Sequence, residues 1–269
     1  MKMFASLVLL LVLGVLGAVQ AGCRRTERAH GRADPLRIGA SPVPHAAILE
    51  HVKPALARDG ITLEVVEMTD YVQPNLALVD RTLDGNFFQH QPYLEAFNRD
   101  RGAELVAVAR VHVEPLGVYS KKVRALGALG PDAIVAIPND PTNTARALEL
   151  LQAAGVLRLG PAKEPTARDV IAGPKTPRLR ELEGAQLPRV LVDVDAAVIN
   201  GNYALEAGLI PSRDAIVRED ASSRYANVLV ARADRATDER LEALVKELTR
   251  ESTRRFIEER FRGSLVPAF

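Results

Sequence analysis

The chain lacks most of the features that would point to a disulfide-stabilised or nucleic-acid-binding protein. It contains a single cysteine, Cys23, so no disulfide can form within the chain. The chain has 35 basic and 34 acidic residues. Residues 1–23 contain one basic residue, Lys2, and no acidic residue, so the rest of the chain carries 34 residues of each sign. Because phosphate binding requires a basic surplus, this balance excludes nucleic acid as an expected partner.

The chain also lacks the short motifs of common enzyme classes. It has no Gly-x-Ser-x-Gly turn, no phosphate-binding glycine loop and no His-Glu-x-x-His zinc motif. The closely spaced acids Asp193 and Asp195 lie beside a predicted strand start, where turn or capping roles are typical. We therefore predict that the protein is not an enzyme and that it uses no cofactor.

The N-terminal residues have the pattern of an export signal. Lys2 precedes an apolar run over residues 4–19, and small residues then lead to Cys23. The run is shorter than the roughly 20 residues that cross a bilayer comfortably, although a transmembrane anchor is the alternative. The segment that ends in Ala-Gly-Cys resembles a bacterial lipobox, although Gln20 stands where leucine is usual. The alternative is ordinary signal-peptidase cleavage, which a sequence with Gln20 also permits. We predict a signal peptide over residues 1–22, lipidation of Cys23, and a flexible tether over residues 23–35.

Strand-like and helix-like segments alternate after the tether. Short apolar or alternating runs predict strands over residues 36–39, 61–65, 105–109, 133–137, 196–199 and 227–230. Apolar residues at helical spacing predict helices over residues 45–59, 74–83, 141–154 and 238–261. This alternation predicts an α/β fold with mainly parallel sheets.

Four segments that follow predicted strands are rich in ligand-type residues. They cover residues 41–45, 70–75, 86–93 and 138–146. Ligands of α/β proteins bind beyond the carboxyl ends of strands, so we expect these segments to be loops around a binding site.

The fourth segment runs into a helix N-terminus, which favours anions. Thr142 or Asn143 could cap or line this N-terminus, and Arg146 could hold a carboxylate through two parallel hydrogen bonds. The alternative is that Arg146 is a solvated helix residue.

The third segment concentrates aromatic residues. Aromatic residues make up 4% of the chain, yet Phe87, Phe88 and Tyr93 fall within seven positions. They could form a cage for a thioether, which is attracted to aromatic rings, or they could be ordinary core residues.

The order and content of these segments resemble a known family. Residues 70–75, 86–93, 119–122, 138–146, 186–189 and 197–200 are similar to those of the NlpA/MetQ family of methionine-binding lipoproteins, and the strings FFQHQPYLE and IPNDPTN are highly specific. Members of that family are substrate-binding subunits of methionine ABC importers.

The resemblance implies a two-lobe fold like that of type II periplasmic binding proteins, with the ligand between the lobes. It places the first lobe at residues 36–116 plus 225–269 and the second at residues 117–224. It also implies an ABC permease and ATPase as partners, and a membrane location that faces the periplasm or the cell exterior.

The resemblance further implies a set of ligand contacts. Four first-lobe residues would surround the methionine side chain, Arg146 would bind its carboxylate, and two asparagines would hold its polar end. The seven positions are Tyr71, Phe88, His90, Tyr93, Arg146, Asn200 and Asn227.

The cargo has alternatives. Some family members bind other amino acids or small methionine peptides, and residues 201–202 and 184–185 depart from the common family pattern. The histidine spacings match no metal-ligand motif, so we expect no metal site, although an exported metal-binding protein is the remaining alternative.

Overall fold

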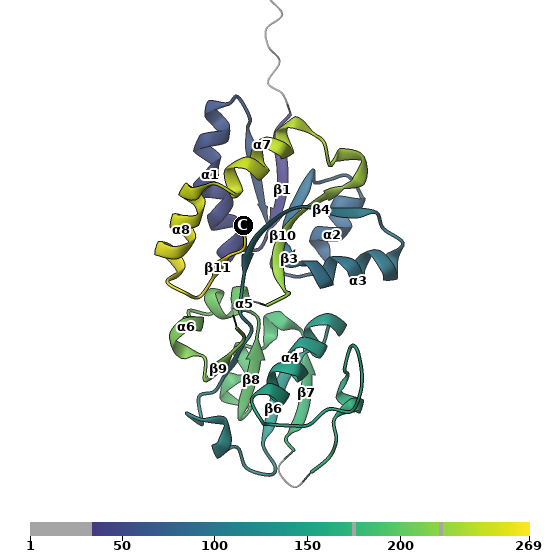
Figure 1. Ribbon diagram of the computed structural model, residues 1–269, viewed down its shortest axis with the longest axis vertical. Helices are drawn as coiled ribbons and strands as arrows, with labels where there is room; N and C mark the ends of the chain where they lie inside the picture. Colours follow the sequence, from purple (N-terminus) through teal and green to yellow (C-terminus); the bar gives the residue numbers. More distant parts are fainter. Residues whose placement is uncertain (1–33, 174–175, 221–222) are drawn as a thin grey trace, which may run out of the picture. The chain divides into compact units, whose positions relative to one another are not determined.

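The apolar runs of the sequence become the strands of two β-sheets, as Figure 1 shows. The computed structural model describes residues 34–173, 176–220 and 223–269. The predicted signal peptide, Cys23 and tether residues 24–33 lie outside the described residues. The carbonyl of Asp34 accepts a hydrogen bond from Arg240 Nη1 at 2.9 Å, so the folded part includes the last two residues assigned to the tether.

The first sheet has the strand order β11-β4-β10-β3-β1-β2. Its strands are β1 (Leu36–Ala40), β2 (Leu63–Glu67), β3 (Gly85–His90), β4 (Leu105–Val113), β10 (Ala226–Arg232) and β11 (Val266–Pro267). β1 is parallel to β2 and β3, whereas β10 is antiparallel to β3 and β4, and β11 to β4. The helices packed against this sheet are α1 (Ala47–Arg58), α2 (Gln73–Val79), α3 (Gln91–Arg101), α7 (Glu239–Leu248) and α8 (Glu251–Phe261).

The second sheet has the strand order β7-β6-β8-β5-β9. Its strands are β5 (Gly117–Tyr119), β6 (Ile134–Pro138), β7 (Arg178–Leu182), β8 (Ala196–Ile199) and β9 (Val217–Arg218). β6 is parallel to β7 and β8, and β5 is antiparallel to β8 and β9. The helices between these strands are α4 (Pro141–Ala153), α5 (Gly201–Glu206) and α6 (Pro211–Asp214), and 3₁₀ turns lie at Leu126–Ala128, Ala167–Asp169, Gly184–Gln186 and Arg189–Val192. A further 3₁₀ turn, Ala233–Arg235, follows β10 of the first sheet.

Each sheet contains both parallel and antiparallel strands, and helices connect many of the strands. The predicted α/β class is therefore confirmed. We refer to each sheet with its helices as the first and the second lobe. The first sheet takes its strands from residues 36–113 and 226–267, and the second from residues 117–218. The lobe boundaries at residues 116/117 and 224/225 stay a prediction. Within the described part of the chain, no helix combines the length and apolar character that crossing a membrane requires.

The C-terminal segment differs from the predicted single helix over residues 238–261. The chain forms α7 and α8 with a break between them, where Arg250 has an extended conformation (φ −79°, ψ 157°). The Thr249 hydroxyl donates to the Val245 carbonyl at 2.9 Å, a contact that bends helices. The buried Thr253 donates to the Glu247 carbonyl at 2.7 Å across the break, which lets both helices bury their apolar faces.

The helix predicted over residues 74–83 is also shorter, since α2 ends at Val79. Arg81 follows it in the left-handed region with φ 62°. The amides of Thr82 and Leu83 both donate to the Ala77 carbonyl, so a tight turn replaces the last predicted helical turn and directs the chain into β3.

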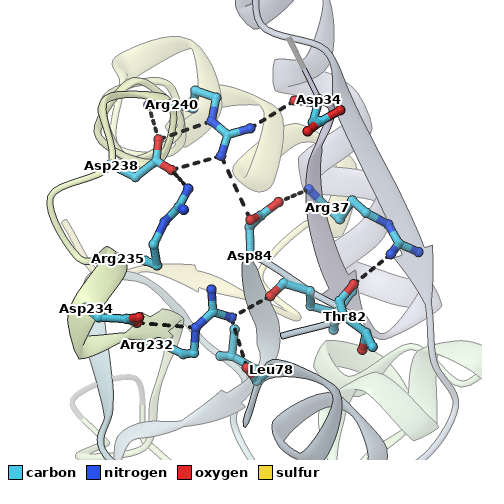
Figure 2. Close-up of polar contacts among 11 residues, drawn as sticks. Asp34, Arg37, Leu78, Thr82, Asp84, Arg232, Asp234, Arg235, Asp238 and Arg240 are labelled. Carbon is cyan, nitrogen blue, oxygen red and sulfur yellow. Dashed lines mark hydrogen bonds and ion pairs between the residues drawn. The ribbon is translucent and has the colours of Figure 1, made fainter. Parts of the chain in front are cut away.

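Near the amino ends of β1 and β3, charged side chains of the first lobe form a network of hydrogen bonds and ion pairs (Figure 2). Asp238 caps α7 by accepting from the Arg240 amide at 2.9 Å, and its carboxylate also accepts from the side chains of Arg240 and Arg235. Asp84, directly before β3, accepts from the Arg37 amide of β1 at 2.9 Å and lies 3.9 Å from Arg240. Phe88 and His90 lie toward the opposite, carboxyl end of β3, so this network is separate from the predicted ligand site.

Candidate functional site

All seven residues predicted to contact a ligand line one pocket. The pocket takes its walls from both lobes, and its space of about 330 Å³ includes a part that is open to solvent. Its lining consists of Tyr71, Phe88, Gln89, His90, Tyr93, Glu114, Asn143, Arg146, Asn200, Gly201, Asn202 and Asn227. The structure therefore brings together residues that are up to 156 positions apart in the sequence, from Tyr71 to Asn227.

Residues 86–93, predicted as a loop, form all of β3 except its first residue, together with the first turn of α3. Phe88 and His90 are two positions apart in the strand, so they project on the same side of the sheet. His90 caps α3, because its Nδ1 atom accepts a hydrogen bond from the Tyr93 amide at 3.1 Å. The strand end and the helix cap fix three pocket residues more firmly than a loop would.

Three aromatic rings form one wall of the pocket. The ring centroids of Tyr71, Phe88 and Tyr93 are 6.0 Å apart in each of the three pairs. The Tyr93 hydroxyl donates to the Tyr71 carbonyl at 2.9 Å, which fixes the two segments relative to each other. Burial raises the pKa of both tyrosine hydroxyls, so they are neutral at physiological pH. The wall suits an apolar, polarisable side chain.

A buried amide network supports this wall from behind. The Asn75 Oδ1 atom accepts from Asn86 Nδ2 at 2.8 Å and from Gln89 Nε2 at 2.7 Å, and Asn75 Nδ2 donates to Gln89 Oε1 at 2.9 Å. Asn75 belongs to α2, which begins two residues after Tyr71, whereas Asn86 and Gln89 belong to β3. The network thus joins the two segments that supply Tyr71 and Phe88.

The second lobe contributes the N-terminus of α4. Asp140 is its cap, rather than Thr142 or Asn143, and accepts from the Asn143 amide at 3.0 Å. Asn143 instead faces the pocket, where its Oδ1 atom lies 3.1 Å from His90 Nε2 and 2.9 Å from Asn200 Nδ2. Burial, followed by the nearby Arg146 charge, lowers the pKa of His90 to about 3. His90 is therefore neutral and donates from Nε2 to Asn143 in the opposite lobe.

Arg146 is a buried ion-pair residue and not a solvated one. Its side chain is 3% exposed, and its Nε and Nη2 atoms contact the Glu219 carboxylate at 2.8 Å and 2.5 Å. Nη2 also donates to the Glu114 carbonyl at 2.8 Å, and the guanidinium lies 4.3 Å from the ring centre of Tyr225. Arg146 of the second lobe thus contacts both chain segments that connect the two sheets.

Polar groups from both lobes complete the pocket. Tyr71 donates to Asn202 Oδ1 at 2.5 Å, and Asn227 Oδ1 lies 3.1 Å from His45 Nε2. The Asn200 Oδ1 atom is buried and has no hydrogen-bond partner among the described residues. An acceptor of this kind in the pocket is suited to a ligand N–H group.

Sequence reasoning missed two carboxylates at this site, Glu114 and Glu219. Glu114 follows Val113 and precedes Pro115 and Leu116, so an acid within an apolar run was a usable signal. Glu219 lies 73 positions from Arg146 in the sequence, and no local pattern indicated their pairing.

Comparison with known proteins assigns the chain to a family. The family model described as NlpA lipoprotein matches residues 36–269. The chain belongs to the NlpA lipoprotein family. Both the two-lobe fold and the predicted family resemblance are therefore confirmed.

Individual relatives of this NlpA family member agree with that assignment. The D-methionine-binding lipoprotein MetQ of Escherichia coli (strain K12) is 40% identical over 243 residues, which cover 87% of each chain. A solved periplasmic substrate-binding protein of an ABC transporter from Coxiella burnetii is 41% identical with a TM-score of 0.83, covering 87% of this chain and 100% of that one. A nutrient-binding protein from Burkholderia cenocepacia, solved bound to methionine, is 42% identical with a TM-score of 0.84 and the same coverage.

Proposed function

We propose that this NlpA family member is the lipid-anchored substrate-binding component of an ABC importer, and that it captures methionine between its lobes. The observation that carries the proposal is one pocket with an aromatic wall on one side and buried polar and charged groups on the other. Relatives at about 40% identity support it: one is named as a D-methionine-binding lipoprotein, and another was solved with methionine bound.

Each end of methionine has matching groups in the pocket. The thioether side chain would lie against Tyr71, Phe88 and Tyr93, with His90 beside them. The carboxylate would bind the Nη1 atom of Arg146, because Nε and Nη2 already donate to Glu219 and to the Glu114 carbonyl and orient the guanidinium.

The ammonium group would lie among oxygen acceptors. Asn200 Oδ1 has no partner among the described residues, and Asn227 and the Glu114 carboxylate line the same pocket. A buried ammonium requires such acceptors, since leaving it unpaired costs several kcal/mol.

Because these groups come from both lobes, methionine would favour the closed arrangement. A permease could then distinguish loaded from empty protein by that arrangement. The partners would be an ABC permease and its ATPase, and Cys23 would carry the lipid that holds the protein at the membrane. The protein would release its cargo unchanged and would not act as an enzyme.

The test uses the soluble form that begins after Cys23, unfolded and refolded to remove bound ligand. Thermal unfolding is then measured against both stereoisomers of each amino acid, methionine peptides and divalent metals. A ligand at a hundred times its Kd stabilises the protein by about 2.7 kcal/mol, so methionine should give a large shift. A shift with another compound and none with methionine would contradict the proposal.

Matched arginine variants show whether the pocket is the binding site. Arg146→Lys keeps the positive charge but loses the planar guanidinium that Glu219 orients towards the ligand, and it should weaken methionine binding about tenfold or more. Arg99→Lys changes a side chain that is 57% exposed and outside the pocket, and it should leave binding unchanged.

A further inference from the structure

Two buried histidines converge on Glu114 behind the pocket. His45 precedes α1 and His112 lies near the end of β4; they are 1% and 0% exposed. The Nε2 atom of His45 lies 3.3 Å from Glu114 Oε1, and that of His112 lies 2.9 Å from the same oxygen. Neither histidine lines the pocket, whereas Glu114 does.

The surroundings of the two rings define their hydrogen positions. The Nδ1 atoms of His45 and His112 are buried and have no hydrogen-bond partner among the described residues. A hydrogen on Nδ1 would therefore be buried without an acceptor, so each neutral ring carries its hydrogen on Nε2. Burial lowers the pKa of His45 to about 4 and of His112 to about 3, so both are neutral donors at physiological pH.

The rings are held in these orientations by packing. Phe87 contacts both of them edge-on, with centroid distances of 4.6 Å to His45 and 5.4 Å to His112. His45 Nε2 also lies 3.1 Å from Asn227 Oδ1, so the same ring touches a second pocket residue.

Glu114 is fixed from the second lobe as well. Its carboxylate accepts from the backbone amide of Asn202, and its carbonyl accepts from Arg146. A Cβ atom at Gly201 would lie 2.9 Å from Glu114 Oε2, so the absence of a side chain there leaves room for the carboxylate.

These contacts counteract the effect of burial. Burial raises the pKa of the Glu114 carboxyl above its ordinary value, and His45, Arg146 and the Asn202 amide offset only part of that rise. Neutral N–H donors favour the carboxylate form without placing a positive charge that would repel an ammonium group. The charged group facing Glu114 from α4 is Arg146, and the titratable group from α5 is Glu206.

We infer that His45 and His112 are positioning residues that hold Glu114 as a carboxylate for the ammonium group of the cargo. This inference rests on the proposed capture of an amino acid. It assigns a function to two buried polar residues that lie outside the pocket lining.

The same three side chains are also a possible ligand set for a divalent metal. A metal on both Nε2 atoms would move the hydrogens to Nδ1, and metal-bound histidines almost always donate that hydrogen to a neighbouring carboxylate, carbonyl or water. Since His45 and His112 offer no such acceptor among the described residues, the hydrogen-bonded arrangement fits better.

The test compares His112→Leu with His112→Gln, and His45→Leu with His45→Gln. Glutamine can donate from nearly the position of Nε2, whereas leucine cannot. Two probes are titrated by calorimetry: methionine, and 4-(methylthio)butanoate, which lacks the amino group. Thermal unfolding of each variant without ligand confirms that it is folded.

We expect each leucine variant to bind methionine about tenfold more weakly at neutral pH, and each glutamine variant to retain most of the affinity. The analogue without an amino group should bind the wild type and all folded variants equally. In the wild type, methionine affinity should fall as the pH falls, because protonated Glu114 cannot accept from the ammonium. In the leucine variants, that loss should begin at a higher pH.

Glu206→Gln, measured over the same pH range, separates the contribution of Glu206, whose pKa burial raises to about 7. An equal loss for both probes, or an equal loss in the leucine and glutamine variants, would assign the histidines a purely structural role and overturn the inference. Zn²⁺ binding that disappears in the variants, with methionine affinity unchanged, would overturn it in favour of a metal site. Absence of amino-acid binding in the wild type would instead refute the proposed function.

Discussion

Arg146 and Glu219 form a two-point ion pair at the junction of the two lobes, with Nε to Oε1 at 2.8 Å and Nη2 to Oε2 at 2.5 Å. Glu219 also accepts from the Leu116 amide at 3.0 Å. The pair therefore links α4 to both chain segments that connect the sheets.

Glu219→Ala should destabilise the protein without ligand by roughly 3 kcal/mol, because it leaves a buried arginine without its partner. Methionine should then stabilise the variant more than it stabilises the wild type, since the ligand carboxylate replaces the missing charge. Thermal unfolding with and without methionine measures both effects. An unchanged midpoint without ligand would show that the ion pair contributes nothing to stability.

Phe88→Leu should reduce the preference for methionine over norleucine, which has a methylene in place of the sulfur. Sulfur–aromatic contacts contribute about 0.3–1.5 kcal/mol, so the ratio of the two Kd values should fall by about 2- to 10-fold. Phe97→Leu is the control, because Phe97 does not line the pocket. A ratio that stays constant in Phe88→Leu would place the thioether elsewhere.

Asn75→Leu should both destabilise the protein and weaken methionine binding. The substitution removes the hydrogen bonds of Asn75 to both amides and leaves the buried Gln89 Oε1 atom without a donor, at about 1–3 kcal/mol, whereas Asn86 Nδ2 still donates to the Pro74 carbonyl and Gln89 Nε2 to Asn86 Oδ1. It also releases Tyr71 from its fixed position relative to Phe88. Asn98→Leu is the matched control: Asn98 bonds the Leu105 backbone outside the pocket, so its loss should lower stability and leave the methionine Kd unchanged.

Asp238→Ala should destabilise the first lobe by about 1–2 kcal/mol at neutral pH through loss of the α7 cap. Hydrogen bonds from Arg240 hold the pKa of Asp238 below its ordinary value of 3.8. The wild-type contribution is therefore complete above about pH 4 and is lost as the pH falls further. Acid titration of unfolding should be less steep in the variant, whereas Asp59→Ala, an exposed control, should match the wild type.

Cys23→Ala should release the protein from the membrane fraction. A lipid-modified cysteine anchors a protein through acyl chains, and Cys23 is the single cysteine of the chain. Fractionation followed by mass spectrometry of the N-terminus tests this prediction. A wild-type protein that begins at Gly22 or earlier would show ordinary secretion without lipidation.

Much of the local structure could be predicted from the sequence. The helix predicted at residues 141–154 is α4, Pro141–Ala153, and the strand predicted at residues 196–199 is β8. The periodicity of apolar residues predicted one helix where the structure has α7 and α8. At the break between them, the Thr249 hydroxyl donates a hydrogen bond to a backbone carbonyl, an interaction that competes with regular helix geometry. The prediction was also wrong at residues 86–93, where a loop was predicted from ligand-type residues and a strand end and helix cap were found.

The sequence by itself determined the α/β class, the family and the seven ligand-contact candidates, because these depend on local patterns and specific strings. Only the tertiary structure placed all seven in one pocket and paired Arg146 with Glu219 and Glu114 with two histidines. Such pairs join positions as far apart as Arg146 and Glu219, and the order of strands in the sheets decides which of them meet. Whether Arg146 was solvated or buried was open in the sequence; the structure settled it, because a buried guanidinium requires the carboxylate partner that the fold supplies.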